Sequence, residues 1–372
     1  MRVLYIANRS EIFGGGQISL IELLSRLDRS RFEPMVLCPG EGGLSEKVKA
    51  LNIPALFWEM PTARTINLFK TAEKVRELRS IILENNVDII HANGSRAQFY
   101  SSLAVKGTGA KLIWHVREST PDRWLYDWFI GNSARRIICV SQGAKEKRFG
   151  HFPSLDPKLR VVYNGVDTQR FKKDPGSRRS VREDLGVGDD DILLGHIGLL
   201  TRQKGHQILL KAISILAGNN PNIKLLIMGK TIDVAYVKRL TTMTKQLGLD
   251  DNIIFSEPRE DVEATLSALD IFILPSEREG FSRALIEAMS SSLPIIASDV
   301  EGNNEAIIHE ETGFLVPYGD VYLLAEDIQK LLKDRNMSEK MGQNARKRVE
   351  KRFNIETHVS AIQELYEEIF KN

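Results

Sequence analysis

The fold of this chain is decided by the stretch Ser276-Glu277-Arg278-Glu279-Gly280-Phe281-Ser282-Arg283-Ala284-Leu285-Ile286-Glu287-Ala288-Met289. Residues 268–275, just before it, are mostly apolar and end in a proline, which predicts a buried strand that stops there. After a short loop, apolar residues recur at helical spacing, and Ser282 stands where a helix would be capped. Strand, loop and helix in this order are typical of an open α/β sheet, where ligands bind at the carboxyl ends of the strands.

Two of the carboxylates in this unit, Glu279 and Glu287, are candidates for a binding site. Glu279 falls in the predicted loop, and Glu287 falls about one and a half turns into the predicted helix. The helix N-terminus between them offers free N–H groups and a positive dipole end to a phosphate. The pair suits a ligand with a central diphosphate and hydroxyl-rich groups at each end, as in a nucleotide-sugar. Ordinary surface glutamates would show the same spacing, but the loop position favours a site.

Short β-rich runs alternate with amphipathic helical stretches along the whole chain. This alternation predicts an α/β fold of two Rossmann-like, doubly wound parallel-sheet domains facing a cleft. In the first half the predicted strands are Val3–Ala7, Pro34–Cys38, Ala55–Trp58, Asp88–His91, Lys111–Val116, Arg136–Val140 and Leu159–Tyr163, and the predicted helices include Gln17–Leu27, Asn67–Leu83 and Arg96–Lys106. In the second half the predicted strands are Ile192–Ile197, Ile223–Met228, Ile253–Phe255, Ile271–Leu274, Pro294–Ala297 and Phe314–Val316.

A chain of 372 residues exceeds the usual single core, so two domains of about 150–200 residues are expected. The boundary is predicted at Asn164-Gly165-Val166-Asp167 and the polar, basic stretch that follows, where turn residues are common and apolar ones few. The predicted domains are residues 1–166 and 167–355. After the last strand, Lys330–Arg352 and His358–Phe370 are predicted to form two closing helices.

Charge is divided unevenly between the two halves. The chain as a whole has a net charge of +2, but residues 1–167 contain 24 Lys and Arg against 17 Asp and Glu, a net of +7. A basic first domain favours an anionic partner such as a phospholipid surface or a lipid-diphosphate acceptor. Solvated helix faces would also explain any single residue of this set. The basic residues in question are Arg64, Lys70, Lys74, Arg76, Arg79, Arg123, Arg135 and Arg136.

The cellular compartment is predicted from the cysteines and from the apolar segments. Cys38 and Cys139 both fall inside apolar, strand-like runs, which favours reduced core residues over a disulfide framework. No charged-then-apolar signal segment and no run of about 18 apolar residues is present. The expected location is therefore cytoplasmic, with at most peripheral contact with the inner face of a membrane.

Three further positions fall where predicted strands end. Gly15 and Gly16 open a helix after the first strand, where glycines allow close backbone approach to an anion, although a flexible turn explains them equally well. Lys204, with Arg202 beside it, lies between a strand and a helix of the second half and could neutralise a diphosphate. His115 ends a strand expected to face the cleft between the domains, although a buried structural histidine fits equally well.

Other kinds of chemistry are not supported by the sequence. The seven histidines form no H-x-x-x-H pattern and no pairing with cysteine, so no metal site is predicted. No Gly-x-Ser-x-Gly elbow and no readable Ser-His-Asp arrangement is present.

These motifs together resemble the family 4 retaining glycosyltransferases of GT-B fold, also described as glycosyl transferases group 1. The resemblance covers nearly the whole chain and is most specific over residues 190–320. It is carried by Glu279-Gly280-Phe281 with Glu287-Ala288-Met289, by Gly198 to Lys204-Gly205, and by Val162-Tyr163-Asn164-Gly165-Val166-Asp167.

The resemblance implies a role for each residue of the site. Glu279 would contact hydroxyls of the donor sugar, Glu287 would bind the ribose and Lys204 would bind the diphosphate. His115 would reach the donor sugar across the cleft, and a last helix around residues 356–372 would return to the first domain. Backbone groups would line the phosphates and sugar from one domain at Gly280, Phe281, Ser282 and Leu285, and from the other at Gly14, Gly15 and Gly16.

The chain departs from the family pattern at several positions. Leu199 stands where the family usually has an arginine, which removes one of two cations expected on the leaving diphosphate. Such a contact contributes about 1.5–3 kcal/mol, and Arg202 is the candidate to replace it. Glu257 and Ser292 replace glycines often found in neighbouring loops.

The sequence therefore predicts a metal-independent retaining glycosyltransferase. It would move a hexose or N-acetylhexosamine from a nucleotide diphosphate sugar, UDP- or GDP-linked, to an acceptor hydroxyl on a saccharide or lipid-linked saccharide, in cell-surface polysaccharide or glycolipid biosynthesis. Two alternatives remain: a nucleotide-sugar epimerase on the same fold, and a non-catalytic nucleotide-sugar-binding subunit, which Leu199 would favour.

Overall fold

The computed structural model describes residues 1–61, 68–119 and 124–371. The chain forms two compact units: Met1–Asn164 with Ile355–Asn372 is unit 1, and Gly165–Asn354 is unit 2. The change from unit 1 to unit 2 falls two residues before the predicted boundary at 166/167. Arg64, Arg123 and the predicted helix start at Asn67 lie outside the described residues.

Unit 1 contains a seven-stranded sheet in the order β3-β2-β1-β4-β5-β6-β7, with every neighbouring pair parallel. Its strands are β1 Arg2–Ile6, β2 Glu33–Cys38, β3 Ala55–Phe57, β4 Ile89–Asn93, β5 Lys111–Val116, β6 Arg136–Cys139 and β7 Leu159–Val161. Its helices are α1 Gly15–Arg26, α2 Gly43–Ala50, α3 Leu68–Glu84, α4 Ser95–Ala104, α5 Trp124–Ser133, α6 Gln142–Phe149, the 3-10 helix η1 Pro153–Lys158, and α15 Ile355–Lys371.

Unit 2 contains a six-stranded sheet in the order β10-β9-β8-β11-β12-β13, again with parallel neighbours. Its strands are β8 Ile192–Ile197, β9 Ile223–Met228, β10 Ile253–Ser256, β11 Ile271–Leu274, β12 Ile295–Ser298 and β13 Phe314–Val316. Its helices are α7 Pro175–Asp184, the 3-10 helix η2 Arg202–Lys204, α8 His206–Ala217, α9 Val234–Gln246, α10 Val262–Ala268, α11 Arg283–Ser290, α12 Asn303–Ala306, α13 Val321–Lys333 and α14 Arg335–Arg352.

Both sheets are buried on their two faces, as side-chain alternation along the strands requires. In β1, Val3 and Tyr5 join the core formed with α1 and α15, while Leu4 and Ile6 join the core formed with α3 and α4. Strands buried on both faces read as continuous apolar runs, which is why they could be predicted. Five predicted strands match the observed bounds: Lys111–Val116, Ile192–Ile197, Ile223–Met228, Ile271–Leu274 and Phe314–Val316.

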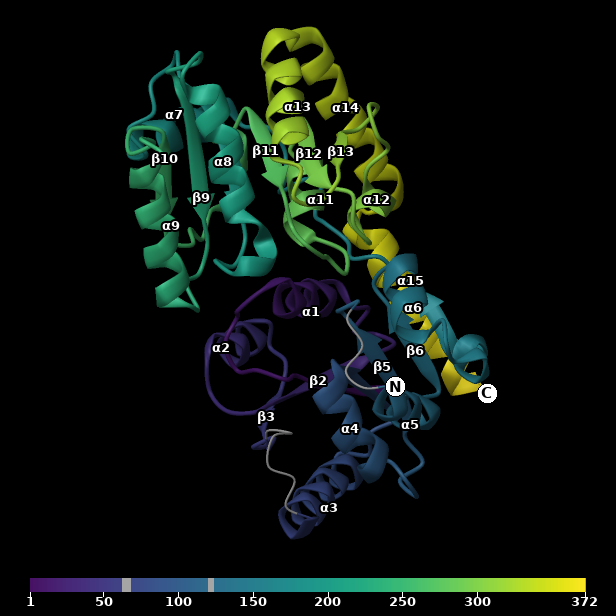
Figure 1. Cartoon of the computed structure of the whole chain (residues 1–372). Helices are drawn as coiled ribbons and strands as arrows, with labels where there is room; N and C mark the ends of the chain where they lie inside the picture. The colour runs from purple at the N-terminus through teal and green to yellow at the C-terminus, as the bar shows by residue number, and fades with distance from the viewer. Residues whose placement is uncertain (62–67, 120–123, 372) are drawn as a thin grey trace. The chain divides into compact units, whose positions relative to one another are not determined.

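The last helix of the chain, α15, belongs to unit 1 (Figure 1). Its apolar side packs into the same core as β1 and α1 through Leu365, Tyr366 and Ile369. Glu368 on the same helix is ion-paired with Arg136 of β6. The C-terminal segment is therefore a structural part of the first sheet's helical layer.

One predicted helix is wrong. Lys330–Arg352 was expected to be continuous, but α13 ends at Lys333 and α14 begins at Arg335. Asp334 lies between them, and its Oδ1 accepts a hydrogen bond from the backbone N–H of Met337 at 2.9 Å. An aspartate that caps the second helix in this way ends the first one. No described helix is long and apolar enough to cross a membrane.

Candidate functional site

Lys204 and Glu279 form an ion pair at the carboxyl edge of the unit 2 sheet. Lys204 ends η2, which follows β8, and Glu279 lies in the loop after β11, the neighbouring strand. Lys204 Nζ lies 2.5 Å from Glu279 Oε1, and the two side chains are only 18% and 9% exposed. The structure thus brings together two residues that the sequence predicted for one site.

The two loops that carry this pair are bonded to each other. Gln203 Nε2 donates to the carbonyl of Arg278 at 3.0 Å, and the N–H of Glu277 donates to the carbonyl of Gln203 at 2.8 Å. Gly205, the residue directly after η2, has φ +72°, and a Cβ there would lie 1.9 Å from the Pro275 carbonyl oxygen. Only glycine fits this position, so the turn after Lys204 depends on it.

The backbone from Gly280 to Ser282 is held from two sides. Gly302, in the loop before α12, has φ +81°, and a Cβ there would lie 2.4 Å from the Gly280 carbonyl oxygen. Phe281 is buried, with its ring centroid 5.0 Å from that of Phe353. The side chain of Phe281 therefore anchors the loop in the interior of the protein.

Ser282 caps α11 as predicted. Its Oγ accepts from the backbone N–H of Leu285 at 3.4 Å, and the helix starts at the next residue. The first turn of a helix leaves N–H groups without helical partners and carries the positive end of the dipole. The start of α11, with its free N–H groups, therefore directly follows the loop that carries Glu279.

Glu287 is held by a neighbour one turn earlier on α11. Arg283 Nε and Nη2 donate to Glu287 Oε1 at 3.2 and 2.8 Å, and Arg283 Nη1 donates to the carbonyl of Gly165 at 3.1 Å. Both bonds end on Oε1, and no hydrogen bond among the described residues ends on Oε2. The i,i+4 spacing could have predicted this pair, but sequence reasoning missed Arg283.

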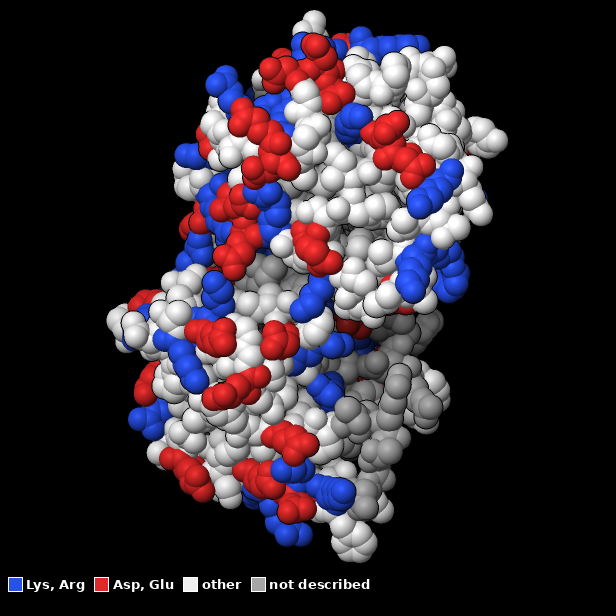
Figure 2. Space-filling view, turned by 90° about the vertical axis from the view of Figure 1, so that its left-hand side faces the viewer, with Lys and Arg blue, Asp and Glu red and all other residues white. Residues whose placement is uncertain are grey.

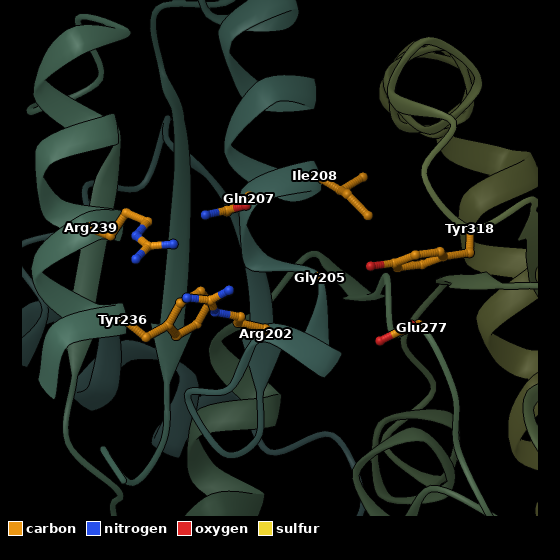
Figure 3. Close-up of a pocket in the computed structure, with 8 residues that line it drawn as sticks. All are labelled: Arg202, Gly205, Gln207, Ile208, Tyr236, Arg239, Glu277 and Tyr318. Carbon is orange, nitrogen blue, oxygen red and sulfur yellow. The ribbon is translucent and has the colours of Figure 1, made fainter. Parts of the chain in front are cut away.

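Arg202 faces a different part of unit 2 from Lys204. It lines a cavity of about 160 Å³ together with Tyr236 and Arg239 of α9. Figure 3 shows the two guanidinium groups near the Tyr236 ring, with Tyr318 and Glu277 across the cavity. None of the described contacts joins Arg202 to the Lys204–Glu279 pair. The remaining lining residues are Gly205, Gln207 and Ile208.

The pKa of Tyr236, which lines this cavity, is shifted from its usual value. Burial raises the pKa of Tyr236 to about 12, although Arg202 and Arg239 act in the opposite direction. Its hydroxyl lies 3.3 Å from Nδ1 of His206. Sequence reasoning missed Arg239 and Tyr236, because no spacing pattern relates α9 to η2.

In unit 1, the predicted glycine loop opens a helix at the carboxyl end of β1. α1 begins at Gly15, after an extended Gly14 with φ −176°. A Cβ on Gly16 would lie 3.0 Å from Cδ of Arg117, so this turn packs closely on the residue that follows β5.

His115 is fully buried at the end of β5. Its Nδ1 lies 3.0 Å from Nε2 of His91, and its own Nε2 has no partner among the described residues. Burial, with Arg117 as the next cause, holds the pKa of His115 well below its usual range. The imidazole is therefore neutral and suited to a hydrogen bond, not to an ion pair.

The described residues contain no group of three or more His, Cys, Asp or Glu that could hold a metal ion. Leu199, two residues after β8, is partly buried and contributes no charge at the position where the resemblance implies an arginine.

Comparisons with known proteins identify the family of the chain. Residues 13–170 match the family model "Glycosyltransferase Family 4", and residues 177–348 match "Glycosyl transferases group 1". The chain is 25% identical to UDP-Gal:alpha-D-GlcNAc-diphosphoundecaprenol alpha-1,3-galactosyltransferase of Escherichia coli, covering 97% of this chain and 95% of that protein. It is 27% identical to lipopolysaccharide core biosynthesis mannosyltransferase LpsB of Rhizobium meliloti, covering 90% and 92%.

Solved structures show the same fold. Anabaena HepE in complex with UDP-glucose superposes with a TM-score of 0.88 at 24% identity, covering 99% of this chain and 100% of HepE. Two parallel-sheet α/β domains of this kind define the GT-B class of glycosyltransferases. The chain belongs to the family 4 glycosyltransferases, the glycosyl transferases group 1. The predicted fold class and family are both confirmed.

Proposed function

We propose that this glycosyltransferase is a retaining enzyme that takes its sugar from a nucleotide diphosphate sugar bound at the carboxyl edge of the unit 2 sheet. The observation that carries the proposal is the Lys204–Glu279 pair at 2.5 Å. Glu279 lies in the loop that leads to the start of α11, and Glu287 lies further along that helix. In this site Lys204 binds the diphosphate, Glu279 the sugar hydroxyls and Glu287 the ribose.

The chemistry follows from where negative charge develops. As the bond between the sugar C1 and the phosphate oxygen breaks, Lys204 and the N-terminus of α11 stabilise the leaving diphosphate. The acceptor oxygen forms its bond to C1 on the face that the leaving group vacates, and its proton passes to the leaving phosphate oxygen. A lysine and a helix dipole supply the positive charge in this scheme, so no metal is required.

The ion pair has a second consequence for donor binding. Lys204 has three N–H donors and Glu279 has two carboxylate oxygens, so each can contact the donor while the bond between Nζ and Oε1 is kept. Because a charge this buried is costly when it is unpaired, Lys204 keeps Glu279 compensated while the diphosphate brings further negative charge to Lys204 and the sugar hydroxyls donate hydrogen bonds to Glu279.

UDP is the nucleotide that the comparisons support. HepE is described in complex with UDP and UDP-glucose, and the E. coli relative is named for UDP-Gal. A hexose or N-acetylhexosamine carried on UDP is accordingly the proposed donor, with a GDP-linked sugar as the next candidate.

A saccharide on a lipid or polymer carrier is the proposed acceptor, in cell-surface polysaccharide or glycolipid biosynthesis. The relatives' names, which include a diphosphoundecaprenol substrate and lipopolysaccharide core biosynthesis, support this class. On α5 of unit 1, Trp124, Leu125, Trp128 and Phe129 are all exposed. Their i,i+4 spacing gathers them on one side of the helix, which supports peripheral contact with the cytoplasmic face of a membrane.

The charge distribution contributes less to this part of the proposal. On the face drawn in Figure 2, Lys and Arg side chains are interspersed with Asp and Glu. The net excess of positive charge in the first half is not gathered into one patch there, so the aromatic side of α5 is the stronger argument.

Calorimetric unfolding with UDP, GDP, ADP and their common sugar conjugates tests the proposal. A ligand present at 100 times its Kd should stabilise the protein by about 2.7 kcal/mol. Glu287→Gln should weaken the binding of every nucleotide, and Glu350→Gln should leave that binding unchanged. Glu350 is a suitable control because it is also paired with an arginine at i,i+4, Arg346 at 2.8 Å, and lies on α14.

Stabilisation by UDP ligands that Glu287→Gln weakens would support the donor site. No stabilisation by any nucleotide at millimolar concentration would refute it. Leu199 favours a second candidate, a nucleotide-sugar-binding subunit without transferase activity. That candidate predicts normal donor affinity with neither donor hydrolysis nor transfer, whereas an epimerase would convert the donor sugar without any acceptor.

A further inference from the structure

The proposed donor site leaves out a cavity of about 160 Å³ in the same unit. Its walls come from four segments of unit 2: η2 with the start of α8, helix α9, the loop after β11 and the loop after β13. A cavity of this size has room for several water molecules or for a small polar group. The lining residues with charged or hydroxyl side chains are Arg202, Tyr236, Arg239, Glu277 and Tyr318.

Arg202 and Arg239 are the cations of this cavity, and neither has a counter-ion. Among the described residues, no hydrogen bond or ion pair involves either guanidinium group. Elsewhere in unit 2, Arg178 and Arg182 share the carboxylate of Asp270, at 2.7 and 3.4 Å. Both cavity arginines are exposed, so a dissolved anion can reach them. An anion between them would also offset the repulsion of two like charges.

The charged groups of the cavity are divided between a positive side and a negative side. On the positive side, burial raises the pKa of Tyr236 to about 12 and Tyr318 acts in the same direction, while Arg202 and Arg239 lower it. On the negative side, burial raises the pKa of Tyr318, and the Glu277 carboxylate raises it further. Figure 3 shows Glu277 and Tyr318 across the cavity from the two arginines. Glu277 forms no ion pair with any described residue.

This division of charge selects the kind of ligand. The planar guanidinium group matches the oxygens of a phosphate, and two such groups give one phosphate several charge-assisted hydrogen bonds. On the other side, the Glu277 carboxylate can only accept hydrogen bonds, so it suits hydroxyl groups and repels a second anionic group. A phosphate monoester of a molecule rich in hydroxyl groups satisfies both sides of the cavity.

The walls of the cavity are continuous with the loops of the donor site. Gly205, which lines the cavity, directly follows Lys204, and Glu277 lies two residues before Glu279. The N–H of Glu277 donates to the carbonyl of Gln203 at 2.8 Å. A ligand held between the two sides of the cavity therefore restrains both loops that carry the ion pair.

We propose that this cavity is a second anion site, in which Arg202 and Arg239 bind the phosphate of a sugar phosphate or polyol phosphate and Glu277 accepts hydrogen bonds from its hydroxyl groups. The site is separate from the donor diphosphate at Lys204, and its occupation does not depend on the proposed function. Its effect on the donor does rest on that function. Because the bound ester restrains the two donor loops, it makes the nucleotide-sugar bind more tightly.

Isothermal titration calorimetry of the full-length protein, without nucleotide and at one fixed ionic strength, tests the site directly. The probes are glucose 6-phosphate, glycerol 3-phosphate, inorganic phosphate and glucose. At least one of the two esters should bind at millimolar concentration, inorganic phosphate more weakly, and glucose not at all. The absence of binding by both esters would overturn the proposal. Equal affinity for inorganic phosphate and the esters would contradict the role of Glu277.

Two variants test the arginines, and both should fold because the side chains they replace are exposed and unpaired. Arg239→Gln and Arg202→Gln should each weaken ester binding about tenfold or more, because each removes a charge-assisted contact with the phosphate. Ester binding that is unchanged in both variants would show that the ester lies outside the cavity.

Two further variants separate this site from general charge and from the donor site. Lys238 is the exposed neighbour of Arg239 on α9 and does not line the cavity, so Lys238→Gln should leave ester binding unchanged. An equal loss in Lys238→Gln and Arg239→Gln would mean that the ester responds only to the charge of the helix. Lys204→Met should weaken UDP and leave the ester unchanged. If Lys204→Met abolishes ester binding, the ester occupies the diphosphate position and no second site exists.

The effect on the donor is tested by titrating UDP-glucose or UDP-galactose with and without saturating glucose 6-phosphate. The ester should lower the Kd of the nucleotide-sugar about fivefold or more, and Arg239→Gln should abolish this change. An unchanged Kd would contradict the coupling between the two sites. If no nucleotide binds under either condition, the proposed function fails, whereas ester binding measured without nucleotide still decides whether the cavity is an anion site.

Discussion

The two sheets each bury a histidine pair beside a tyrosine, but hydrogen bonds connect the groups differently. In unit 1, His91 bonds to both His115 and Tyr366, at 3.0 and 2.6 Å. In unit 2, His196 and His206 meet edge to face with ring centroids 4.8 Å apart. One pair is thus joined through a hydrogen-bond chain, and the other through ring packing.

The histidines of unit 2 are each held by a separate partner. Nδ1 of His196 lies 3.0 Å from the carbonyl oxygen of Ile273 on the neighbouring strand, so it donates to the backbone. Nδ1 of His206 lies 3.3 Å from the Tyr236 hydroxyl. The sheet itself therefore determines the tautomer of His196.

The difference shows how far each site depends on distant parts of the chain. The unit 2 site is assembled from loops that follow β8, β11 and β12. Glycines stand where the backbones of two of these loops approach each other most closely. In unit 1, His115 bonds to His91, and His91 bonds in turn to Tyr366 of α15, the last helix of the chain. Variants in unit 2 should therefore act on that unit and leave unit 1 unchanged.

The largest effect is expected for Lys204→Met. Loss of a cation that stabilises the leaving diphosphate should lower kcat about 10²–10³-fold, or about 2.7–4 kcal/mol. The measurement is sugar transfer under saturating donor. Lys211→Met, an exposed lysine on α8, is the control and should retain activity. If kcat of Lys204→Met falls by less than about tenfold, a group other than Lys204 stabilises the leaving diphosphate.

Gly205→Ala should destabilise unit 2 by about 3 kcal/mol, because the new Cβ would lie 1.9 Å from the Pro275 carbonyl oxygen at φ +72°. Gly186 has a similar positive φ of +68°, but a Cβ there would have no atom within 4 Å. Gly186→Ala should therefore lower the unfolding free energy by only about 1 kcal/mol.

Urea unfolding can assign the Gly205→Ala effect to one unit. All 4 tryptophans, Trp58, Trp114, Trp124 and Trp128, lie in unit 1, so fluorescence follows that unit alone while circular dichroism follows both. The variant should shift the dichroism transition and not the fluorescence transition. Equal costs for the two glycine variants would show that the tight approach to Pro275 is unimportant.

Leu199→Arg should raise kcat about tenfold or more, because a charge-assisted contact to the diphosphate contributes about 1.5–3 kcal/mol. Steady-state transfer with a UDP-sugar measures the gain. If the variant is no more active than the wild type, the missing family arginine is not a defect in this site. Arg202→Gln in the same assay shows whether the arginine in the cavity contributes, and little change is expected.

The smallest effect concerns pH. Burial lowers the pKa of His206 to about 4, from an ordinary value of about 6.5 in the unfolded chain. The folded state therefore binds fewer protons, so this contribution to stability is complete above about pH 6.5 and is lost as pH falls towards 4.

His206→Gln removes that contribution in unit 2. Between pH 6.5 and 5 the dichroism-detected unfolding free energy of the variant should fall less steeply than that of the wild type, by about 1 kcal/mol per pH unit. The fluorescence transition of unit 1 should keep its wild-type pH dependence, since His91 and His115 are unchanged. Identical slopes for variant and wild type would mean that folding does not lower the pKa of His206.

Local sequence was sufficient for the parts of the molecule that neighbouring residues determine. The strands could be predicted because strands buried on both faces are continuous apolar runs, and Ser282 could be predicted as a cap because capping depends on a few adjacent residues. Lys204 and Glu279 could be assigned to one site because parallel strands end at the same edge. Their roles towards a ligand stay predictions.

Other features depended on tertiary structure. The direction of Arg202 follows from the backbone of a short 3-10 turn, so its position in a cavity with Arg239 was not predictable from spacing. The break at Asp334 was missed because apolar periodicity continues on both sides of a single capping residue.

By itself, the sequence determined two parallel-sheet domains, the family and the residues at the edge of the second sheet. Only the tertiary structure decided which distant groups meet, such as Tyr366 with His91 and the Arg283 guanidinium with the Gly165 carbonyl. The physical reason is one of range. Strand patterning, capping and turn chemistry are interactions between near neighbours, whereas a hydrogen bond between distant segments requires the packed core that brings its donor and acceptor within about 3 Å.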